Sequence, residues 1–301
     1  MRIVVTGSTG LIGKALVRSL RADGHEVVRL VRRPPAAPDE ATWDPRRGYV
    51  APDALAGCDA AVHLAGAGVG DHRWSEAYKK EIRDSRVQGT RTLATALAAL
   101  PQPPRVLVCG SAVGYYGDRG DQELDEDSSA GTGFLPEVCV AWEAAADPAR
   151  AAGIRTVHAR TGLVVTAEGG AWGRMLPLFR AGLGGRLGSG RQYWSWISLR
   201  DEVAALRFLV DEESLAGPVN LTGPGPLTNR ELTAETGRVL HRPAVFAVPA
   251  PAIRLALGEF SQDVLSSQRA LSRRLSEAGF SYTDRTYADA LRWALATGAG
   301  R

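Results

Sequence analysis

The chain opens with Met1-Arg2-Ile3-Val4-Val5-Thr6-Gly7-Ser8-Thr9-Gly10-Leu11-Ile12-Gly13. The apolar, β-branched run at 2–6 predicts a strand, and residues 10–22 follow the pattern of a helix. Gly7 permits a tight turn after the strand, Gly10 lets the backbone approach a pyrophosphate, and Gly13 lets the helix pack closely on the sheet. The free N–H groups and the positive dipole end of such a helix bind phosphates. Strand, turn and helix in this order therefore predict a dinucleotide-binding turn, formed by Gly7, Thr9, Gly10, Leu11, Ile12 and Gly13.

Composition sets limits on the class of protein. The chain has 301 residues, is 45% hydrophobic and 23% charged, and carries a formal net charge of +3, which is typical of a globular α/β protein. The basic pairs Arg32-Arg33 and Arg273-Arg274 are too short to predict a nucleic-acid partner. Three cysteines without metal-ligand spacing predict neither a disulfide framework nor a metal site, and favour the cytoplasm. The chain starts directly with a strand, so we expect no signal peptide, and no apolar run is long enough to predict a membrane partner.

Strand and helix patterns alternate through the first half. Further strands are expected at 26–31, 60–64, 105–109 and 156–160, with helices at 75–100 and 134–152, whereas 33–55 is expected to be mostly loop. This alternation predicts a parallel, doubly wound sheet of the Rossmann type. The second half predicts helices at 172–182, 200–211, 229–240, 252–258 and 287–296, and strands at 193–197, 219–222 and 246–248. We expect residues 1–165 to bind the cofactor, with strands returning from about 194–223. We expect 166–301, including the C-terminal helical segment 249–301, to form a smaller, mixed α/β substrate-side region.

The end of the second predicted strand selects the cofactor. An acidic residue there binds the ribose 2′-hydroxyl of NAD, whereas an arginine receives the 2′-phosphate of NADP. Here the strand ends in Arg32 and Arg33, and no acid is present. A guanidinium group binds a phosphate through paired hydrogen bonds, so the sequence predicts NADP(H). The alternative is an ordinary solvated basic turn.

Motifs in the expected order along the chain resemble the extended short-chain dehydrogenase/reductase superfamily. They are the glycine turn, His63-Leu64-Ala65-Gly66, Gly89-Thr90, Ser111-Ala112-Val113-Gly114-Tyr115-Tyr116-Gly117 and Arg160-Thr161-Gly162-Leu163-Val164. The resemblance implies that Leu64, Ala65 and Gly66 face the cofactor, that Ser111 follows on the next strand, and that Arg160 and Gly162 border the nicotinamide. Family members often pair through helices that flank the sheet, so it also allows a homodimer.

Three segments resemble an atypical branch, labelled epimerase family protein or nucleoside-diphosphate-sugar epimerase-like. They are Ser85-Arg86-Val87-Gln88-Gly89-Thr90, the segment 111–117, and Val138-Cys139-Val140-Ala141-Trp142-Glu143. By the first of them, Arg86 joins the expected cofactor-binding residues. The stretch from about 249 to 291 resembles the small uncharacterised terminal domain of that branch.

The chain departs from the family at the catalytic pair. Typical members carry Tyr-x-x-x-Lys on the helix after the serine motif, with the tyrosine as general acid/base. In one alignment Cys139 takes the tyrosine place and Glu143 the lysine place. In the other, which better fits the spacing to Arg160, Leu135 takes the tyrosine place and Cys139 the lysine place. The usual serine position corresponds to Ala112, or to Ser111 after a shift of one residue.

Four residues remain as candidates for the missing acid/base. Tyr116 is either a proton carrier or a tyrosine that serves only in packing. Cys139 is either a reactive thiol or a small buried side chain, and Glu143 either a proton carrier or an ion-paired glutamate. Ser111 either orients a substrate carbonyl or caps backbone. His63, in a buried strand, is expected to be a core histidine.

These observations favour an NADP(H)-dependent oxidoreductase of the epimerase-like branch that acts on an unidentified small molecule. A non-catalytic NADP(H)-binding protein, acting as a sensor or through a partner, is the alternative. A sugar-nucleotide epimerase is a weaker third hypothesis.

Overall fold

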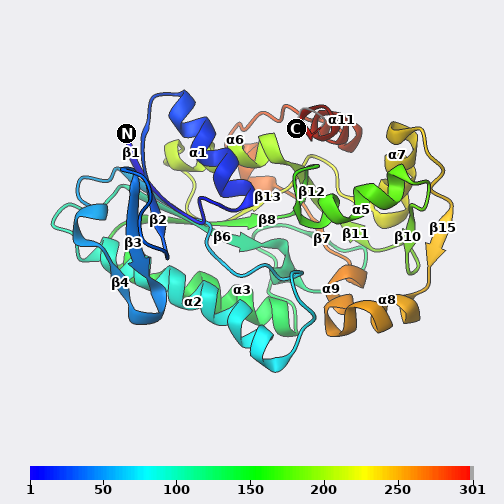
Figure 1. Ribbon diagram of the computed structural model, residues 1–301, viewed down its shortest axis with the longest axis horizontal. Coiled ribbons are helices and arrows are strands. Elements are labelled where there is room, and N and C mark those ends of the chain that lie inside the picture. Colours follow the sequence, from blue (N-terminus) through cyan, green and yellow to red (C-terminus); the bar gives the residue numbers. More distant parts are fainter. Residues whose placement is uncertain (299–301) are drawn as a thin grey trace.

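The computed structural model describes residues 1–298 and shows one main sheet with helices on both faces (Figure 1). Its strands lie in the order β13-β8-β6-β5-β1-β2-β3-β4, and all neighbours are parallel except β3 and β4. The predicted doubly wound, Rossmann-type sheet is confirmed, because the strand order reverses between β1 and β5. The strands are β1 Arg2–Thr6, β2 Glu26–Val31, β3 Glu40–Asp44, β4 Tyr49–Val50, β5 Ala60–His63, β6 Val106–Ala112, β8 Arg155–Thr161 and β13 Gly217–Leu221.

Shorter strands form two-stranded sheets beside the main one. These are β7 Glu123–Leu124 with β16 Arg269–Ala270, β9 Leu163–Val165 with β12 Trp196–Ser198, β10 Gly185–Leu187 with β15 Phe246–Val248, and β11 Tyr193–Trp194 with β14 Leu227–Thr228. The helices are α1 Leu11–Ala22, α2 Glu76–Ala98, α3 Phe134–Ala144, α4 Asp147–Ala151, α5 Gly170–Arg180, α6 Leu199–Asp211, α7 Asn229–Leu240, α8 Ala250–Leu257, α9 Ser261–Leu265, α10 Arg273–Glu277 and α11 Tyr287–Gly298. Turns of 3-10 helix are η1 Pro45–Arg47, η2 Pro52–Ala54, η3 Val113–Tyr116 and η4 Gly258–Phe260.

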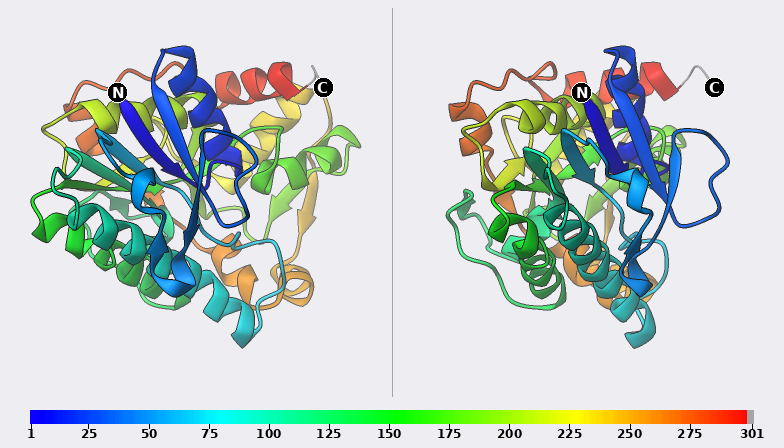
Figure 2. Two further views of the ribbon diagram at one scale, coloured as in Figure 1. Left: turned by 60° about the vertical axis from the view of Figure 1, so that its left-hand side comes forward. Right: turned by 90° about the vertical axis from the view of Figure 1, so that its left-hand side faces the viewer.

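Two helical layers cover the sheet. On one face α1 packs against α6, and Leu16 shares a core with Leu206. On the other face α2 packs against α3 and α4, and Leu93 shares a second core with Ala146. Figure 2 shows the two layers on opposite sides of the sheet, with α11 on the side of α1. Because both faces are covered, the strand β1 is buried and mostly apolar.

The C-terminal segment is part of the same body. Leu275 of α10 lies in the core that contains Val219 of β13. Tyr287 of α11 packs in a third core with Trp172 and Trp196. The predicted division at residues 165–166 stays a prediction, but the two parts share cores rather than meeting only through a linker.

Two local predictions are wrong. The segment 33–55, expected to be mostly loop, contains β3, a strand with polar residues that extends the sheet beside β2. The single helix expected at 134–152 is two helices, α3 and α4. Pro148 lies in the first turn of α4, where a proline fits, whereas it would not fit the interior of one continuous helix.

Candidate functional site

The carboxyl ends of the parallel strands bring the predicted segments to one edge of the sheet. Gly7 follows β1, Leu64 follows β5, and Gly162 follows β8. Ser111 is the second-last residue of β6, and Arg32 follows β2. In open α/β sheets, ligands bind outside these ends, where the strand order reverses. Here that place lies between β1 and β5, with the start of α1 beside it.

The glycine turn has the predicted geometry. Gly7 has a φ of +67°, and a Cβ there would lie 2.6 Å from the Leu64 carbonyl carbon. A Cβ on Gly13 would lie 2.2 Å from the Gly7 carbonyl oxygen, so α1 packs directly on the turn. Gly10 is the N-cap of α1, which has neither a side-chain cap nor an acidic residue in its first turn. The first N–H groups of α1 are therefore open to an anion.

Thr6 fastens the loop after β5 to this turn. Its Oγ1 accepts hydrogen bonds from the N–H groups of Leu64 (3.2 Å) and Ala65 (3.3 Å). The same hydroxyl is hydrogen-bonded to Nδ1 of His63, 2.7 Å away. Burial lowers the pKa of His63 to about 4, so the ring is neutral and is the expected core histidine.

The two arginines after β2 have different environments. The Arg33 guanidinium donates to both carboxylate oxygens of Glu40 (2.8 and 2.6 Å). Hydrogen bonding from Arg33 is the main reason why the pKa of Glu40 falls to about 2. Arg32 is exposed and makes no hydrogen bond or ion pair within residues 1–298. Arg32 is thus the guanidinium available to a ligand, whereas Arg33 is held by β3.

A polar network joins most of the predicted catalytic residues. Ser111 Oγ donates to Glu143 Oε1 (2.7 Å), and Arg160 binds the same carboxylate through Nε (2.8 Å) and Nη2 (2.9 Å). Arg160 Nη1 also donates to the Tyr116 hydroxyl (3.1 Å), which in turn donates to Asn220 Oδ1 (2.8 Å). The sequence did not predict Asn220; its signal is a polar residue within the otherwise apolar run of β13.

The network limits acid/base chemistry. Burial raises the pKa of the Tyr116 phenol to about 12. Its hydroxyl is hydrogen-bonded to two side chains of the protein, Arg160 and Asn220. Burial, and secondarily the charge of Glu143, raises the pKa of the Cys139 thiol to about 12, so it carries no thiolate near neutral pH. Glu143 accepts two hydrogen bonds from Arg160 and is therefore an ion-paired glutamate.

A further carboxyl lies near Cys139. The charge of Asp263, on α9, makes a small contribution to the raised pKa of that thiol. Burial raises the pKa of Asp263 itself to about 6. Ring contacts join α3 to the C-terminal region, since Trp74 packs on Phe134 of α3 (5.0 Å between centroids) and on Phe260 (5.4 Å). Asp263 lacks a motif in the sequence and is found only from this packing.

Two further predicted cofactor residues, Arg86 and Gly162, hold loops in place at the carboxyl edge of the sheet. Arg86 donates to the carbonyls of Ala67 (2.8 Å) and Ile82 (3.1 Å), and so holds the loop that contains Gly66. A Cβ on Gly162 would lie 2.4 Å from the Ser195 carbonyl oxygen, so only glycine lets these two segments meet.

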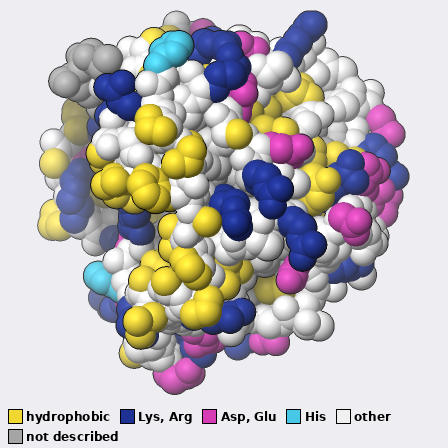
Figure 3. Space-filling view, turned by 90° about the vertical axis from the view of Figure 1, so that its right-hand side faces the viewer, with side chains coloured by type: hydrophobic (Ala, Val, Ile, Leu, Met, Phe, Trp, Pro, Cys, Tyr) yellow, Lys and Arg dark blue, Asp and Glu magenta, His cyan; other side chains and the backbone are white. Residues whose placement is uncertain are grey.

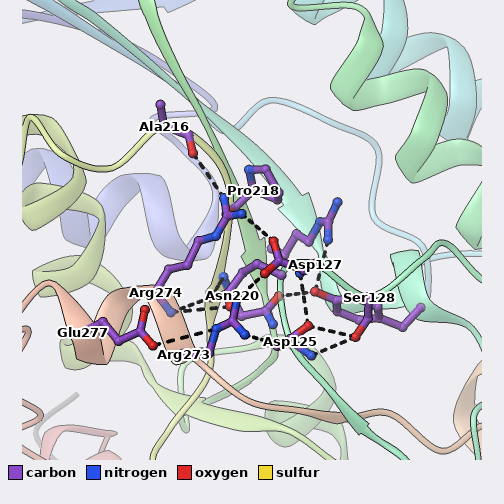
Figure 4. Close-up of polar contacts among 12 residues, drawn as sticks. Asp125, Asp127, Ser128, Ala216, Pro218, Asn220, Arg273, Arg274 and Glu277 are labelled. Carbon is purple, nitrogen blue, oxygen red and sulfur yellow. Dashed lines mark hydrogen bonds and ion pairs between the residues drawn. The ribbon is translucent and has the colours of Figure 1, made fainter.

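The acidic loop 118–127 is fixed to the C-terminal region. Asp125 accepts from Arg273, and Asp127 accepts from both Arg273 and Arg274 (Figure 4). In addition, Glu126 accepts from the backbone N–H of Asn220 (3.0 Å). The loop is thereby linked to the Tyr116–Asn220 end of the network.

Glu202, at the start of α6, gives a prediction for stability. It is fully buried, accepts from Thr161 Oγ1 (2.8 Å), and its Oε2 has no partner. Burial raises its pKa from 4.5 to about 8. Between these values the folded state keeps a proton that the unfolded chain releases, so stability falls as pH rises. We expect Glu202→Gln to raise the free energy of unfolding at pH 8 by on the order of 2–4 kcal/mol, with little change at pH 4.

Urea unfolding at both pH values measures this effect, with the exposed Glu213→Gln as the matched control. If native and Glu202→Gln proteins lose stability in parallel between pH 5 and pH 8, the assignment is wrong.

Within residues 1–298, no cluster of three or more His, Cys, Asp and Glu side chains is arranged to hold a metal. In the same part of the chain, no helix has the length and apolar character needed to cross a bilayer.

Comparison with known proteins identifies the family. Residues 3–221 match the model of the NAD dependent epimerase/dehydratase family, and residues 248–294 match a domain of unknown function (DUF1731). Epimerase family protein MT2273 of Mycobacterium tuberculosis is 49% identical over 97% of both chains. Human epimerase family protein SDR39U1 is 37% identical, over 94% of this chain and 96% of its own.

Two solved structures are similar along the chain. The crystal structure of human SDR39U1 (isoform 2) with NADPH superposes with a TM-score of 0.91 and 35% identity, over 100% of each chain. A nucleoside-diphosphate sugar epimerase from Corynebacterium glutamicum gives a TM-score of 0.80 and 35% identity, over 98% of this chain and 58% of the other. With the glycine turn and the strand order described above, these matches show that the chain belongs to the NAD dependent epimerase/dehydratase family.

Proposed function

We propose that the chain binds NADP(H) at the carboxyl edge of the sheet and acts as an epimerase-like oxidoreductase on a small molecule. The observation that carries this proposal is the glycine turn, with its uncapped helix start and the unpaired Arg32 nearby. The human relative, crystallised with NADPH and similar over its whole length, supports the same cofactor. When bound, NADP(H) supplies a nicotinamide that gives or takes a hydride.

The assignment of residues follows the order of the strands. The N–H groups at the start of α1 would hold the pyrophosphate, in the turn made by Gly7, Thr9, Gly10, Leu11, Ile12 and Gly13. The loop after β5, with Leu64, Ala65 and Gly66, would line the cofactor, and Arg86 would hold that loop in place. At the ends of β6 and β8, Ser111, Arg160 and Gly162 would border the nicotinamide.

Arg32 is assigned to the 2′-phosphate. Replacing Arg32 by Asp removes a charge-assisted pair and adds repulsion, so we expect the affinity for NADPH to fall about 100-fold. The affinity for NADH, which has no 2′-phosphate, should stay within about threefold. Fluorescence titration with both nucleotides measures the two affinities. Arg91→Asp, an exposed charge change in the second half of α2, is the matched control. An equal loss for NADPH and NADH would contradict the assignment.

The polar network at the sheet edge limits which residue can carry a proton. Tyr116, Cys139 and Glu143 are engaged or neutral, as described above, so we assign Glu143 and Arg160 to positioning Ser111. We propose Asp263, whose pKa is raised by burial to about 6, as a further candidate for the proton carrier.

A specific observation favours a second function. Because Ser111, Tyr116 and Glu143 are all engaged in one hydrogen-bonded network, a non-catalytic NADP(H)-binding role fits the same geometry. A panel of carbonyl compounds and sugar nucleotides, mixed with the NADPH complex and followed by absorbance, separates the two. Oxidation of NADPH supports the enzyme, whereas a stable complex against the whole panel supports the binding protein.

A further inference from the structure

An exposed apolar segment lies in the C-terminal third of the chain. Residues 244–257 read Ala-Val-Phe-Ala-Val-Pro-Ala-Pro-Ala-Ile-Arg-Leu-Ala-Leu, with Arg254 as the one charged side chain. Ten of these fourteen residues are exposed, and only Ile253 is buried. Val245 is 80% exposed and Leu255 is 79% exposed. We call this segment, which contains β15 and α8, the apolar arm.

The apolar arm belongs to a wider apolar face. Its strand β15 pairs with β10, and two further exposed leucines, Leu178 and Leu183, lie in the segment that leads into β10. Figure 3 shows hydrophobic side chains gathered on this side of the molecule, with Lys and Arg side chains between them. Exposed apolar patches of this kind mark interaction sites in folded proteins.

The same face is strongly basic. The segments 169–200 and 242–258 contain no Asp or Glu, but they contain seven arginines. Arg174 and Arg200 pair with acids from other parts of the chain. The other five have no carboxylate partner within residues 1–298; they are Arg180, Arg186, Arg191, Arg242 and Arg254. The whole chain carries a net charge of only +3, so positive charge is concentrated here.

We propose that the apolar arm docks on the surface of an anionic lipid bilayer. Val245, Phe246 and Leu255 would enter the interface between headgroups and acyl chains, while Arg242 and Arg254 bind lipid phosphates. Beside Val245 lies a shallow groove of about 490 Å³ that is also lined by Arg238, His241 and Arg242. Arg238 is paired with Glu235, so Arg242 is the arginine of this groove that can bind an anionic headgroup.

Charge argues against a second copy as the occupant. A twofold interface would place this basic face against itself, and like charges in contact repel. A bilayer with anionic headgroups complements the arginines and accepts side chains that project singly, without matching pockets.

The sequence predicts no membrane partner because no apolar run can span a bilayer. Lying on a bilayer requires only an exposed apolar segment, and exposure becomes visible in the structure. The inference is independent of NADP(H) binding.

Vesicle flotation tests the proposal. The full chain is mixed with vesicles of phosphatidylcholine alone, or of phosphatidylcholine with phosphatidylglycerol. We expect flotation with the anionic vesicles only, with release as salt rises, because salt screens the arginine–lipid attraction. Replacing Val245, Phe246 and Leu255 by Ser, or Arg242 and Arg254 by Glu, should lower the bound fraction about tenfold or more.

Matched controls keep the result specific. Tyr49→Ser with Val140→Ser removes apolar groups that are each 46% exposed elsewhere. Arg83→Glu with Arg91→Glu reverses two exposed charges on α2. Both control proteins should float like the native chain. All replaced side chains are exposed, and circular dichroism with NADPH titration checks that each variant is folded.

Three results would overturn the proposal. They are no flotation of the native chain with anionic vesicles, equal flotation of the native and arm-substituted chains, and a native dimer in solution that the arm substitutions convert to a monomer. The last result would assign the arm to a second copy.

Discussion

Gly13→Ala is expected to lower the affinity for NADPH by at least about 100-fold. The added Cβ would lie 2.2 Å from the Gly7 carbonyl oxygen and 3.0 Å from Ser8 Cα. Both are backbone atoms, so the start of α1 must move away from the turn and its N–H groups no longer converge on one phosphate site. Overpacking of this kind also costs about 1–3 kcal/mol of stability. NADPH fluorescence on protein whose folded fraction is known from circular dichroism measures the loss.

The control for this prediction is Gly173→Ala in α5. There the nearest atom to an added Cβ is 3.9 Å away, and affinity should be unchanged. If Gly13→Ala bound NADPH within about threefold of the native chain, the start of α1 would not be the phosphate site.

Removing the Glu143 carboxylate should destabilise the chain by about 3–5 kcal/mol. Glu143→Ala leaves the Arg160 guanidinium, whose side chain is 3% exposed, without its two charge-assisted hydrogen bonds. It also leaves the buried Ser111 hydroxyl without an acceptor. An unpaired buried charge costs far more than an exposed pair contributes. Urea denaturation near pH 7 measures the difference.

Glu137→Ala is the matched control, because Glu137 lies on the same helix but is exposed. It should change stability by less than about 0.5 kcal/mol. A loss below about 1 kcal/mol for Glu143→Ala would mean that the Arg160 pair is not a structural element of the site.

Local patterns were enough to predict much of the fold. Hydrophobic periodicity and the glycine spacing predicted β1, β2 and the helix α1, because these depend on neighbours in sequence. By contrast, β3 has polar residues, and its place as a strand depends on pairing with β2, which includes the contact between Arg29 and Glu40. Such pairing is a tertiary property.

In the candidate site, too, the sequence predicted the parts whose residues are neighbours along the chain and not the contacts between separate elements. The glycine turn could be predicted because all its residues lie within one short segment. The contact of Glu143 with Arg160 and Ser111 joins three separate elements, so the sequence left the role of Glu143 open. For the same reason, the sequence could not show that Glu40 binds Arg33 and leaves Arg32 unpaired.

Calorimetric titration of the native chain with NADPH and, separately, with NADH tests the central claim most directly. We expect saturable binding of NADPH that is about 10- to 100-fold tighter than binding of NADH, because only NADPH offers a 2′-phosphate to Arg32. Equal affinity for the two nucleotides would contradict the role of Arg32, and no saturable binding of either would contradict the dinucleotide site itself.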